Sequence, residues 1–203
     1  MPPSHRTRYD SVAMTLHWVI ALLIMLDFAL ALSFSRFDPG DALYLPAAYD
    51  LHMATGLCIL LLSLARLAWR LMHRPPPFPA MGTGLRWIAH TSHVLLYLFM
   101  IGAPLTGWLV LSLRHQATSV FGLFSWAWPT VPAIAHMSHA ERQLWHDQFL
   151  PLHIRLSYAG MSLVGLHITA ARYHHFVRRD DVLTRMLPRK PDPLPEGPTA
   201  HNT

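Results

Sequence analysis

The chain has 203 residues, of which 52% are hydrophobic and 13% charged, whereas an average soluble domain has about 25% charged residues. This composition excludes a largely disordered chain, and the single cysteine, Cys58, excludes a disulfide-stabilised scaffold. The formal net charge of +5 would fit nucleic-acid binding, unless the basic residues are segregated for another reason.

Four segments are apolar and long enough to cross a membrane, which takes about 20 residues of helix. They span residues 12–34, 51–71, 87–113 and 152–176. Buried helices of a soluble protein are the alternative, but four such segments leave too little polar surface for a soluble bundle. We predict an all-α membrane protein, a four-helix transmembrane bundle formed as one domain by residues 1–190, with a disordered cytoplasmic tail at 191–203.

The basic residues predict the orientation of this bundle, because loops rich in Arg and Lys stay in the cytoplasm. Twelve fall on the side of both termini, namely Arg6, Arg8, Arg66, Arg70, Arg74, Arg86, Arg172, Arg178, Arg179, Arg185, Arg189 and Lys190. Four fall on the other side, namely Arg36, Arg114, Arg142 and Arg155. We therefore predict cytoplasmic N- and C-termini, and this topology explains the positive charge without nucleic acid.

Six histidines lie in or beside these segments, and an ionisable residue inside a membrane indicates a functional site. They are His17, His52, His90, His93, His153 and His167. His153 and His167 are 14 residues apart, which on a helix is about 21 Å and about 40° short of four turns, so both face one side. Gly160 lies midway on that side and leaves room for a flat group against the backbone. Two planar cofactors stacked along the bundle would use this arrangement.

Depth in the membrane predicts the partner of each histidine. His52 begins the second segment at the outer surface, level with His153. His17 begins the first segment at the inner surface, level with His167. His90 and His93 begin the third segment at the same inner level and compete with His17, and spacing alone does not choose among them.

Arg66 and Gly56 share the second segment with His52. Arg66 follows His52 by 14 residues, so it lies on the same face at the inner level, where it would either pair with a carboxylate of the inner cofactor or extend to the inner surface. Gly56, one turn after His52, would relieve crowding at the outer cofactor or allow close helix packing.

Two imidazoles on one iron give a low-spin, six-coordinate heme suited to electron transfer. Helix bundles build such sites from side chains on facing helices. The chain has no Cys-x-x-Cys-His motif, which excludes covalent c-type attachment. We therefore predict non-covalent heme b, two per chain.

Several stretches match a known membrane family. They are Leu16-His17-Trp18, Leu51-His52 with Gly56 and Arg66, Ala89-His90-Thr91-Ser92-His93, His153 with Gly160 and Gly165-Leu166-His167, and Tyr173-His174-His175 with Leu183-Thr184-Arg185-Met186-Leu187-Pro188. Over about residues 8–190 the chain resembles the bacterial cytochrome b561 family, which are small diheme, quinone-linked membrane proteins. The resemblance implies that His17 and His167 ligate a cytoplasmic-side heme and that His52 and His153 ligate a periplasmic-side heme.

The resemblance also implies an inner-membrane location and electron transfer between the outer surface and the quinone pool. Some members of the family are superoxide oxidases, which oxidise superoxide at the outer face and reduce ubiquinone. The chain departs from the family at Asp27, an acid within the first segment. It also departs in an outer loop that carries His115, His136, His139 and His146.

The preferred function is one-electron oxidation of a small periplasmic donor such as superoxide, coupled to ubiquinone reduction. One alternative is a cytochrome b anchor subunit that carries electrons between a partner dehydrogenase or hydrogenase and quinone. Another is a metal transporter lined by histidines, although the third segment is nearly bare of polar residues beyond His90 and His93.

Several polar residues outside the ligand set carry weaker predictions. His174, two turns beyond His167, is a candidate quinone-binding residue that could also supply protons, or else an interfacial histidine. Arg114, Arg142 and Arg155 could steer an anion such as superoxide to the outer face. His136, His139 and His146 could bind a metal, but a polar loop at the membrane interface is preferred.

Overall fold

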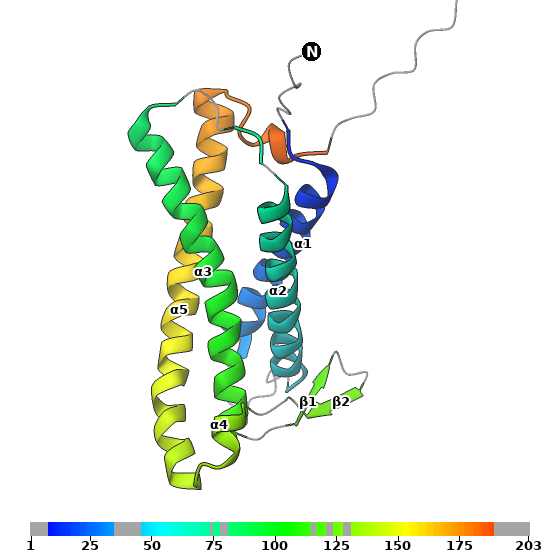
Figure 1. Cartoon of the computed structure of the whole chain (residues 1–203), viewed down its shortest axis with the longest axis vertical. Coiled ribbons are helices and arrows are strands. Elements are labelled where there is room, and N and C mark those ends of the chain that lie inside the picture. Colours follow the sequence, from blue (N-terminus) through cyan, green and yellow to red (C-terminus); the bar gives the residue numbers. More distant parts are fainter. Residues whose placement is uncertain are drawn as a thin grey trace, which may run out of the picture.

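The computed structural model describes residues 8–34, 46–73, 75–77, 81–114, 117–120, 124–127 and 131–188. Among these, four long helices run side by side (Figure 1): α1 (Ser11–Phe34), α2 (Pro46–Met72), α3 (Thr83–Arg114) and α5 (His139–Tyr173). The connection from α3 to α5 contains an antiparallel hairpin and one helical turn: β1 (Ala117–Val120), β2 (Phe124–Ala127) and α4 (Pro132–Ala135). The predicted tail at 191–203 lies outside the described residues.

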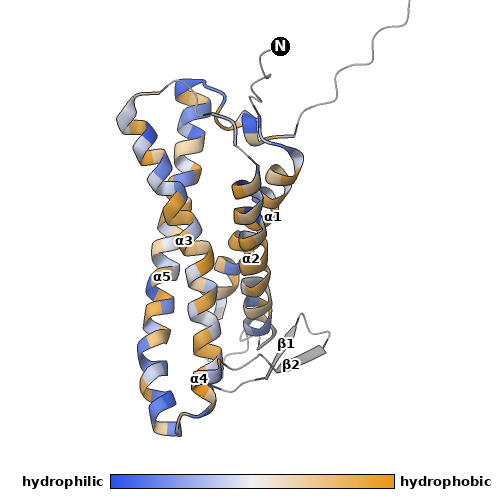
Figure 2. Cartoon of the chain, viewed as in Figure 1, coloured by the Kyte–Doolittle hydropathy of each residue, from blue (hydrophilic) through white to orange (hydrophobic). Residues whose placement is uncertain are grey.

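Three of the described helices are long and apolar enough to cross a membrane, namely Ser11–Ser33, Ala48–Met72 and Thr83–Arg114. The helical fold class is thereby confirmed, with three helices suited by length and composition to cross a membrane. The short hairpin is an addition that the sequence pattern did not predict. The helix α5 falls outside this set because His153, Arg155, His167 and Arg172 interrupt its apolar residues. Figure 2 shows this mixture along α5, beside the more uniformly hydrophobic α1 and α2. A fourth crossing and the side of the termini stay predictions.

The helices associate as two pairs. The helix α1 packs along α2, α3 packs along α5, and contacts between α2 and α3 join the pairs. A small hydrophobic core lies where the two helix pairs meet. It consists of Ile20, Ile24, Ile59 and Met100, and Phe28 and Phe99 pack against it.

Large apolar side chains are exposed along the bundle. Leu22 of α1, Leu98 of α3 and Leu166 of α5 keep 69%, 63% and 62% of their surface exposed. A soluble protein rarely exposes so continuous an apolar surface, whereas a bundle surrounded by lipid does.

The helix α5 begins earlier than the predicted segment at 152–176. Ser138 caps it: the side chain accepts a hydrogen bond from the Glu141 N–H, and the Glu141 carboxylate accepts one from the Ser138 N–H. This reciprocal capping box satisfies two amide groups at the helix start. The Glu141 carboxylate also accepts a hydrogen bond from the Ser138 hydroxyl at 2.7 Å, and this bond together with the one from the Ser138 N–H holds the pKa of Glu141 below its usual value. The helix then continues through Pro151 as one element to Tyr173, where a π-helical turn, His174–Arg178, follows.

The two ends of the described chain meet at one end of the bundle. Arg8 donates to the Leu187 carbonyl, the Tyr9 amide donates to the Arg185 carbonyl at 3.3 Å, and the Trp18 indole donates to the Met186 carbonyl at 2.8 Å. We call these contacts between residues 8–18 and 185–187 the terminal clasp. Since residues 8–18 and 185–187 meet at the same end, the four long helices form an up-and-down bundle.

The start of α1 is fixed near the clasp by Asp10. Its carboxylate accepts hydrogen bonds from the Ala13 N–H at 2.9 Å and from the Trp69 indole of α2 at 3.1 Å. Partial burial disfavours the charged carboxylate, but these hydrogen bonds outweigh it and keep the pKa of Asp10 below its usual value. The residue thus caps α1 and ties it to α2.

Candidate heme sites

His52 of α2 and His153 of α5 face each other across the space between the two helix pairs. Their ring centroids are 6.2 Å apart and their planes are inclined by 72°. Both line a mostly apolar cavity of about 530 Å³, together with Asp27, Gly56 and Gly107 among others. A cavity of this size is within the range that binds cofactors.

The separation of the two rings suits a shared metal ion. Two imidazole nitrogens bound to one metal lie about 4 Å apart, because each metal–nitrogen bond is about 2 Å long. Adding the distance from each nitrogen to its ring centre gives a centroid separation close to the observed 6.2 Å. The residues present therefore fit an iron bound between them.

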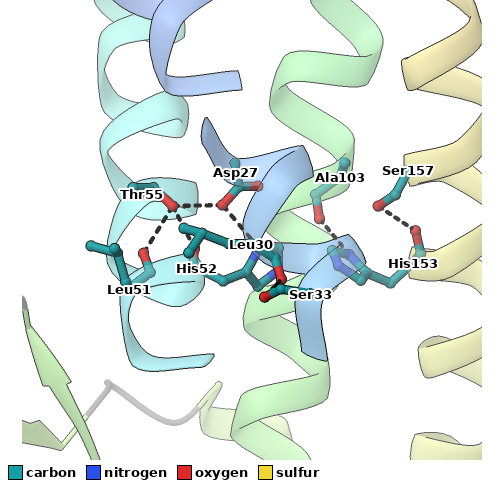
Figure 3. A network of polar contacts seen from close by, with 9 residues as sticks. All are labelled: Asp27, Leu30, Ser33, Leu51, His52, Thr55, Ala103, His153 and Ser157. Atoms are coloured by element: carbon teal, nitrogen blue, oxygen red, sulfur yellow. Dashed lines mark hydrogen bonds and ion pairs between the residues drawn. The ribbon is translucent and has the colours of Figure 1, made fainter. Parts of the chain in front are cut away.

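Each of these histidines has a polar contact at Nδ1 (Figure 3). His52 Nδ1 lies 2.9 Å from Oδ1 of Asp27, and His153 Nδ1 lies 3.0 Å from the Ala103 carbonyl oxygen. Thr106 Oγ1 also lies 3.1 Å from His153 Nδ1. Such contacts at Nδ1 fix the tautomer of a metal-binding histidine and leave Nε2 as the ligand atom.

Gly107 of α3 shapes this site and was not predicted from the sequence. A Cβ added there would lie 3.2 Å from Cε1 of His153, so the glycine gives the imidazole room to lie against α3. No sequence signal distinguishes Gly107 from Gly102 on the same helix, where an added Cβ would meet nothing within 4 Å.

The second site lies toward the clasp. The ring centroids of His17 and His167 are 6.2 Å apart, with planes inclined by 77°. His93 of α3 is also close to His167, at 5.7 Å between centroids, and its Nδ1 lies 2.6 Å from the Ala89 carbonyl oxygen. The structure therefore brings both candidates to His167, while His90 is exposed.

Arg66 lies close to this second site. Its guanidinium is 5.7 Å from the ring centre of Tyr97, a residue that packs against the small core of the bundle. A cation at this position suits a cofactor that carries carboxylates.

The two glycines predicted to make room for a flat group have different surroundings. A Cβ added at Gly56 would meet nothing within 4 Å, and the residue lines the cavity between His52 and His153. Gly160 is buried, and the ring of Phe99 lies against it. Heme contact at either residue stays a prediction.

The family model for prokaryotic cytochrome b561 matches residues 8–189. The chain belongs to this family. It is 30% identical to cytochrome b561 homolog 2 of Escherichia coli (strain K12), over 89% of this chain and 91% of the relative. It is 28% identical to a Yersinia pestis protein named "Probable superoxide oxidase CybB", over 90% and 97%, and 24% identical to cytochrome b561 homolog 1 of E. coli (strain K12), over 90% and 98%.

Membership of the cytochrome b561 family confirms the resemblance read from the motifs. It makes the protein a membrane b-type cytochrome, with heme b as its cofactor and electron transport as its general activity. The matched region includes all four histidines of the predicted ligand set and the residues that surround them.

At the clasp end of this cytochrome, His174 pairs with an acid that the sequence did not single out. His174 Nδ1 lies 2.6 Å from Oδ2 of Asp180, and Arg178 Nε lies 3.6 Å from the same oxygen. Partial burial disfavours the carboxylate, but the hydrogen bonds from His174 and from the Val182 N–H outweigh it and hold the pKa of Asp180 below 3.8.

The arginines predicted to steer an anion lie around the opposite end. Arg114 ends α3 and donates from Nε to Nε2 of the buried His146 at 2.8 Å. Arg142 is half-buried in the first turn of α5, and Arg155 is exposed on the same helix.

The outer-loop histidines do not form a metal site in the part of the chain that the structure covers, since no three His, Cys, Asp or Glu side chains gather there. His136 and His139 are exposed. His115 and Arg36 lie outside the described residues.

Proposed function

We propose that this cytochrome is a diheme superoxide:ubiquinone oxidoreductase of the bacterial inner membrane. The observation that carries the proposal is the presence of two histidine pairs with equal 6.2 Å separations, one toward each end of the bundle. His153 and His167 lie about 21 Å apart on one helix, so the pairs form two sites stacked along the bundle.

Heme b supplies one-electron storage and transfer when it is bound at each site. His52 and His153 would hold the iron at the periplasmic side, where their Nδ1 contacts would leave Nε2 free to bind the metal. His17 and His167 would hold the iron at the cytoplasmic side. Arg66 would offer its positive charge to a heme propionate there, and the open space at Gly56 would accommodate the periplasmic-side heme.

The donor is superoxide, as the name of the Yersinia pestis relative suggests. Two superoxide anions each lose one electron and leave as dioxygen, and one ubiquinone takes up the two electrons and two protons to become ubiquinol. Arg114, Arg142 and Arg155 give the periplasmic end a positive field that attracts the anion.

Ubiquinone reduction takes place at the clasp end, beside His174. The imidazole is directed by the Asp180 carboxylate at 2.6 Å from Nδ1. Its other nitrogen, Nε2, donates a hydrogen bond to a quinone carbonyl when the ring is protonated, and accepts one from a quinol hydroxyl when the ring is neutral. Histidine is in general suited to proton transfer, and ubiquinol formation requires two protons.

The bundle crosses the membrane four times, with both termini in the cytoplasm. Three helices have the length and composition to cross. The helix α5 also presents Ile154, Leu166 and Ile168 to its surroundings, and the clasp brings residues 8–18 and 185–187 to one side. The arginines on the clasp side match the rule that positive loops stay in the cytoplasm.

One purification tests the proposal. The protein extracted in detergent should show a reduced heme b spectrum with two hemes per chain by pyridine hemochromogen assay. Addition of superoxide should then reduce the hemes and, with ubiquinone present, yield ubiquinol. The His174→Ala variant should keep both hemes and lose ubiquinol formation. Reduction by quinol but not by superoxide would reject the oxidase and favour the anchor subunit that serves a partner dehydrogenase.

A further inference from the structure

We infer that Asp27 is a positioning residue for the heme that His52 would ligate, and that its carboxylate lowers the reduction potential of that heme. The inference rests on the proposed function, because it takes His52 as an axial ligand. It gives a role to the one acid within α1, whose partner the sequence could not name.

Asp27 reaches His52 from a neighbouring helix. Asp27 is in α1 and His52 in α2, and Oδ1 of the aspartate lies 2.9 Å from Nδ1 of the imidazole. Their side chains are only 16% and 17% exposed, and both line the cavity shared with His153. A carboxylate inside a membrane helix is costly unless polar groups surround it, so its position beside the imidazole indicates a role.

Thr55 holds the carboxylate in place. Its hydroxyl donates to the same oxygen, Oδ1 of Asp27, at 2.5 Å, and the residue is 1% exposed. The hydroxyl also lies 2.8 Å from the Leu51 carbonyl oxygen, one turn earlier in α2 (Figure 3). Asp27 Oδ1 therefore lies between two groups of α2, and the direction from which it meets His52 is fixed.

The two imidazoles of this site have unequal partners. His153 Nδ1 faces a neutral acceptor, the Ala103 carbonyl oxygen at 3.0 Å, whereas His52 Nδ1 faces a carboxylate. A carboxylate at this distance attracts the N–H of an imidazole more strongly than a neutral carbonyl oxygen does. It draws the Nδ1 proton and raises the basicity of the opposite nitrogen, which makes the histidine a stronger ligand.

A stronger donor ligand stabilises ferric iron more than ferrous iron, and so lowers the reduction potential. The geometry thus makes the His52 heme a poorer electron acceptor than a heme with two carbonyl-bonded histidines. In the proposed direction of flow, this lower potential favours passing the electron onward across the bundle.

A redox titration of the detergent-purified holoprotein tests this inference. In Asp27→Asn the amide keeps the shape but loses the charge, and one of the two hemes should titrate at a higher potential. We expect the equilibrium between ferric and ferrous iron at that heme to shift about tenfold toward the ferrous form. For one electron this corresponds to a rise in reduction potential of about 59 mV. The other heme should be unchanged. Equal potentials in the variant and the wild type would overturn the inference.

Two further variants sharpen the test. Thr55→Val removes the hydroxyl that holds the carboxylate in place, so the contact between Asp27 and His52 loosens and the same potential should rise, by less than in Asp27→Asn. If Asp27→Asn does not accumulate, this variant decides alone, and an unchanged or lower potential overturns the inference. Asp10→Asn removes a carboxylate from the other end of the same helix and should leave the His52 heme unchanged.

Failure of the inference is distinguishable from failure of the proposed function. Heme content is measured first in the wild type and in His52→Ala, which should lose one of two hemes. If both hemes survive His52→Ala, the ligand assignment is wrong and the inference falls with it. If one is lost and the Asp27→Asn titration is unchanged, the ligand set stands and only the role of Asp27 is wrong. The low-spin ferric EPR signal of the affected heme should shift in Asp27→Asn, which a purely structural role would not produce.

Discussion

The ring of Phe99 lies so close to the backbone of Gly160 that a Cβ added to the glycine would come within 2.0 Å of its Cε2 atom. Phe99 also lies 6.0 Å from Phe28, between ring centroids, so it connects α3 to α1 as well as to α5. Gly160 is halfway between His153 and His167 in sequence. In the structure, the flat group against this glycine is a side chain of the protein, at the level between the two histidine pairs.

Gly160→Ala should therefore destabilise the protein. The added methyl group meets the ring of Phe99, and overpacking of this kind typically costs about 1–3 kcal/mol. Thermal unfolding of the holoprotein in detergent measures the change. The matched control is Gly165→Ala on the same helix, where an added Cβ meets nothing within 4 Å. Combining Gly160→Ala with Phe99→Leu should restore part of the lost stability. If the two single changes in unfolding free energy simply add in the double variant, the contact between the two residues is contradicted.

Gly107→Ala should weaken the site formed by His52 and His153. The new methyl group lies 3.2 Å from Cε1 of His153 and would push the imidazole by a few tenths of an ångström. Mutation of groups that position a metal ligand typically costs about 10–100-fold in metal affinity, and we expect Gly107→Ala to lower heme affinity by about tenfold. Heme content and the ferric EPR spectrum report it. Gly102→Ala on the same helix is the control, and equal behaviour of the two variants would refute the steric argument.

The choice between His17 and His93 is open to direct measurement. Both rings lie near His167, at 6.2 Å and 5.7 Å between centroids. We expect His17→Ala to lose one of the two hemes and His93→Ala to keep both, by pyridine hemochromogen assay. The reverse result would transfer the ligand role to His93 and α3.

The pair of His174 and Asp180 should give a pH-dependent contribution to stability. The pKa of Asp180 is depressed below its ordinary value of 3.8. The stabilisation is therefore complete above pH 3.8, and it is lost as the pH falls through the lower, folded-state pKa. At pH 7, Asp180→Asn should cost about 1 kcal/mol, and the difference from wild type should disappear in strong acid.

A neighbouring acid provides the control for that measurement. Asp181 pairs with Arg185 at 2.8 Å, but its side chain is 51% exposed. Surface pairs of this kind contribute about 0–1 kcal/mol, so Asp181→Asn should change the unfolding temperature less than Asp180→Asn. An equal effect of the two variants would show that the contact with His174 has no special value.

Superoxide oxidation should slow as ionic strength rises. Salt screens attraction between the anion and the positive end of the bundle, over a Debye length of about 10 Å at 0.1 M. Arg155→Gln and Arg114→Gln should lower the rate at low salt and flatten its salt dependence. A rate that is independent of salt in the wild-type protein would reject steering by these arginines.

The parts of the structure that follow from helix geometry were predictable. A spacing of 14 residues places His153 and His167 on one face of any α-helix, and the long apolar runs predicted three of the membrane helices. The capping pattern of Ser138 and Glu141 could also have placed the true start of α5, because that signal is local.

The parts that depend on packing between helices could not be read from the sequence. The contact between Asp27 and His52 depends on how α1 rotates against α2, and periodicity gives no such angle. The same holds for Gly107, whose importance arises only because α5 brings His153 against it. The nearness of His93 to His167 likewise depends on the packing of α3 along α5.

The terminal clasp has a consequence for the order in which the bundle is completed. Trp18 and Met186 are 168 residues apart in the chain, yet the indole of the first donates to the carbonyl of the second. At a translation rate of about 5–20 residues per second, α1 waits roughly 10–30 s for this partner to be synthesised. Until then the start of α1 lacks its contacts with residues 185–187, so the terminal clasp is the last part of the bundle to close.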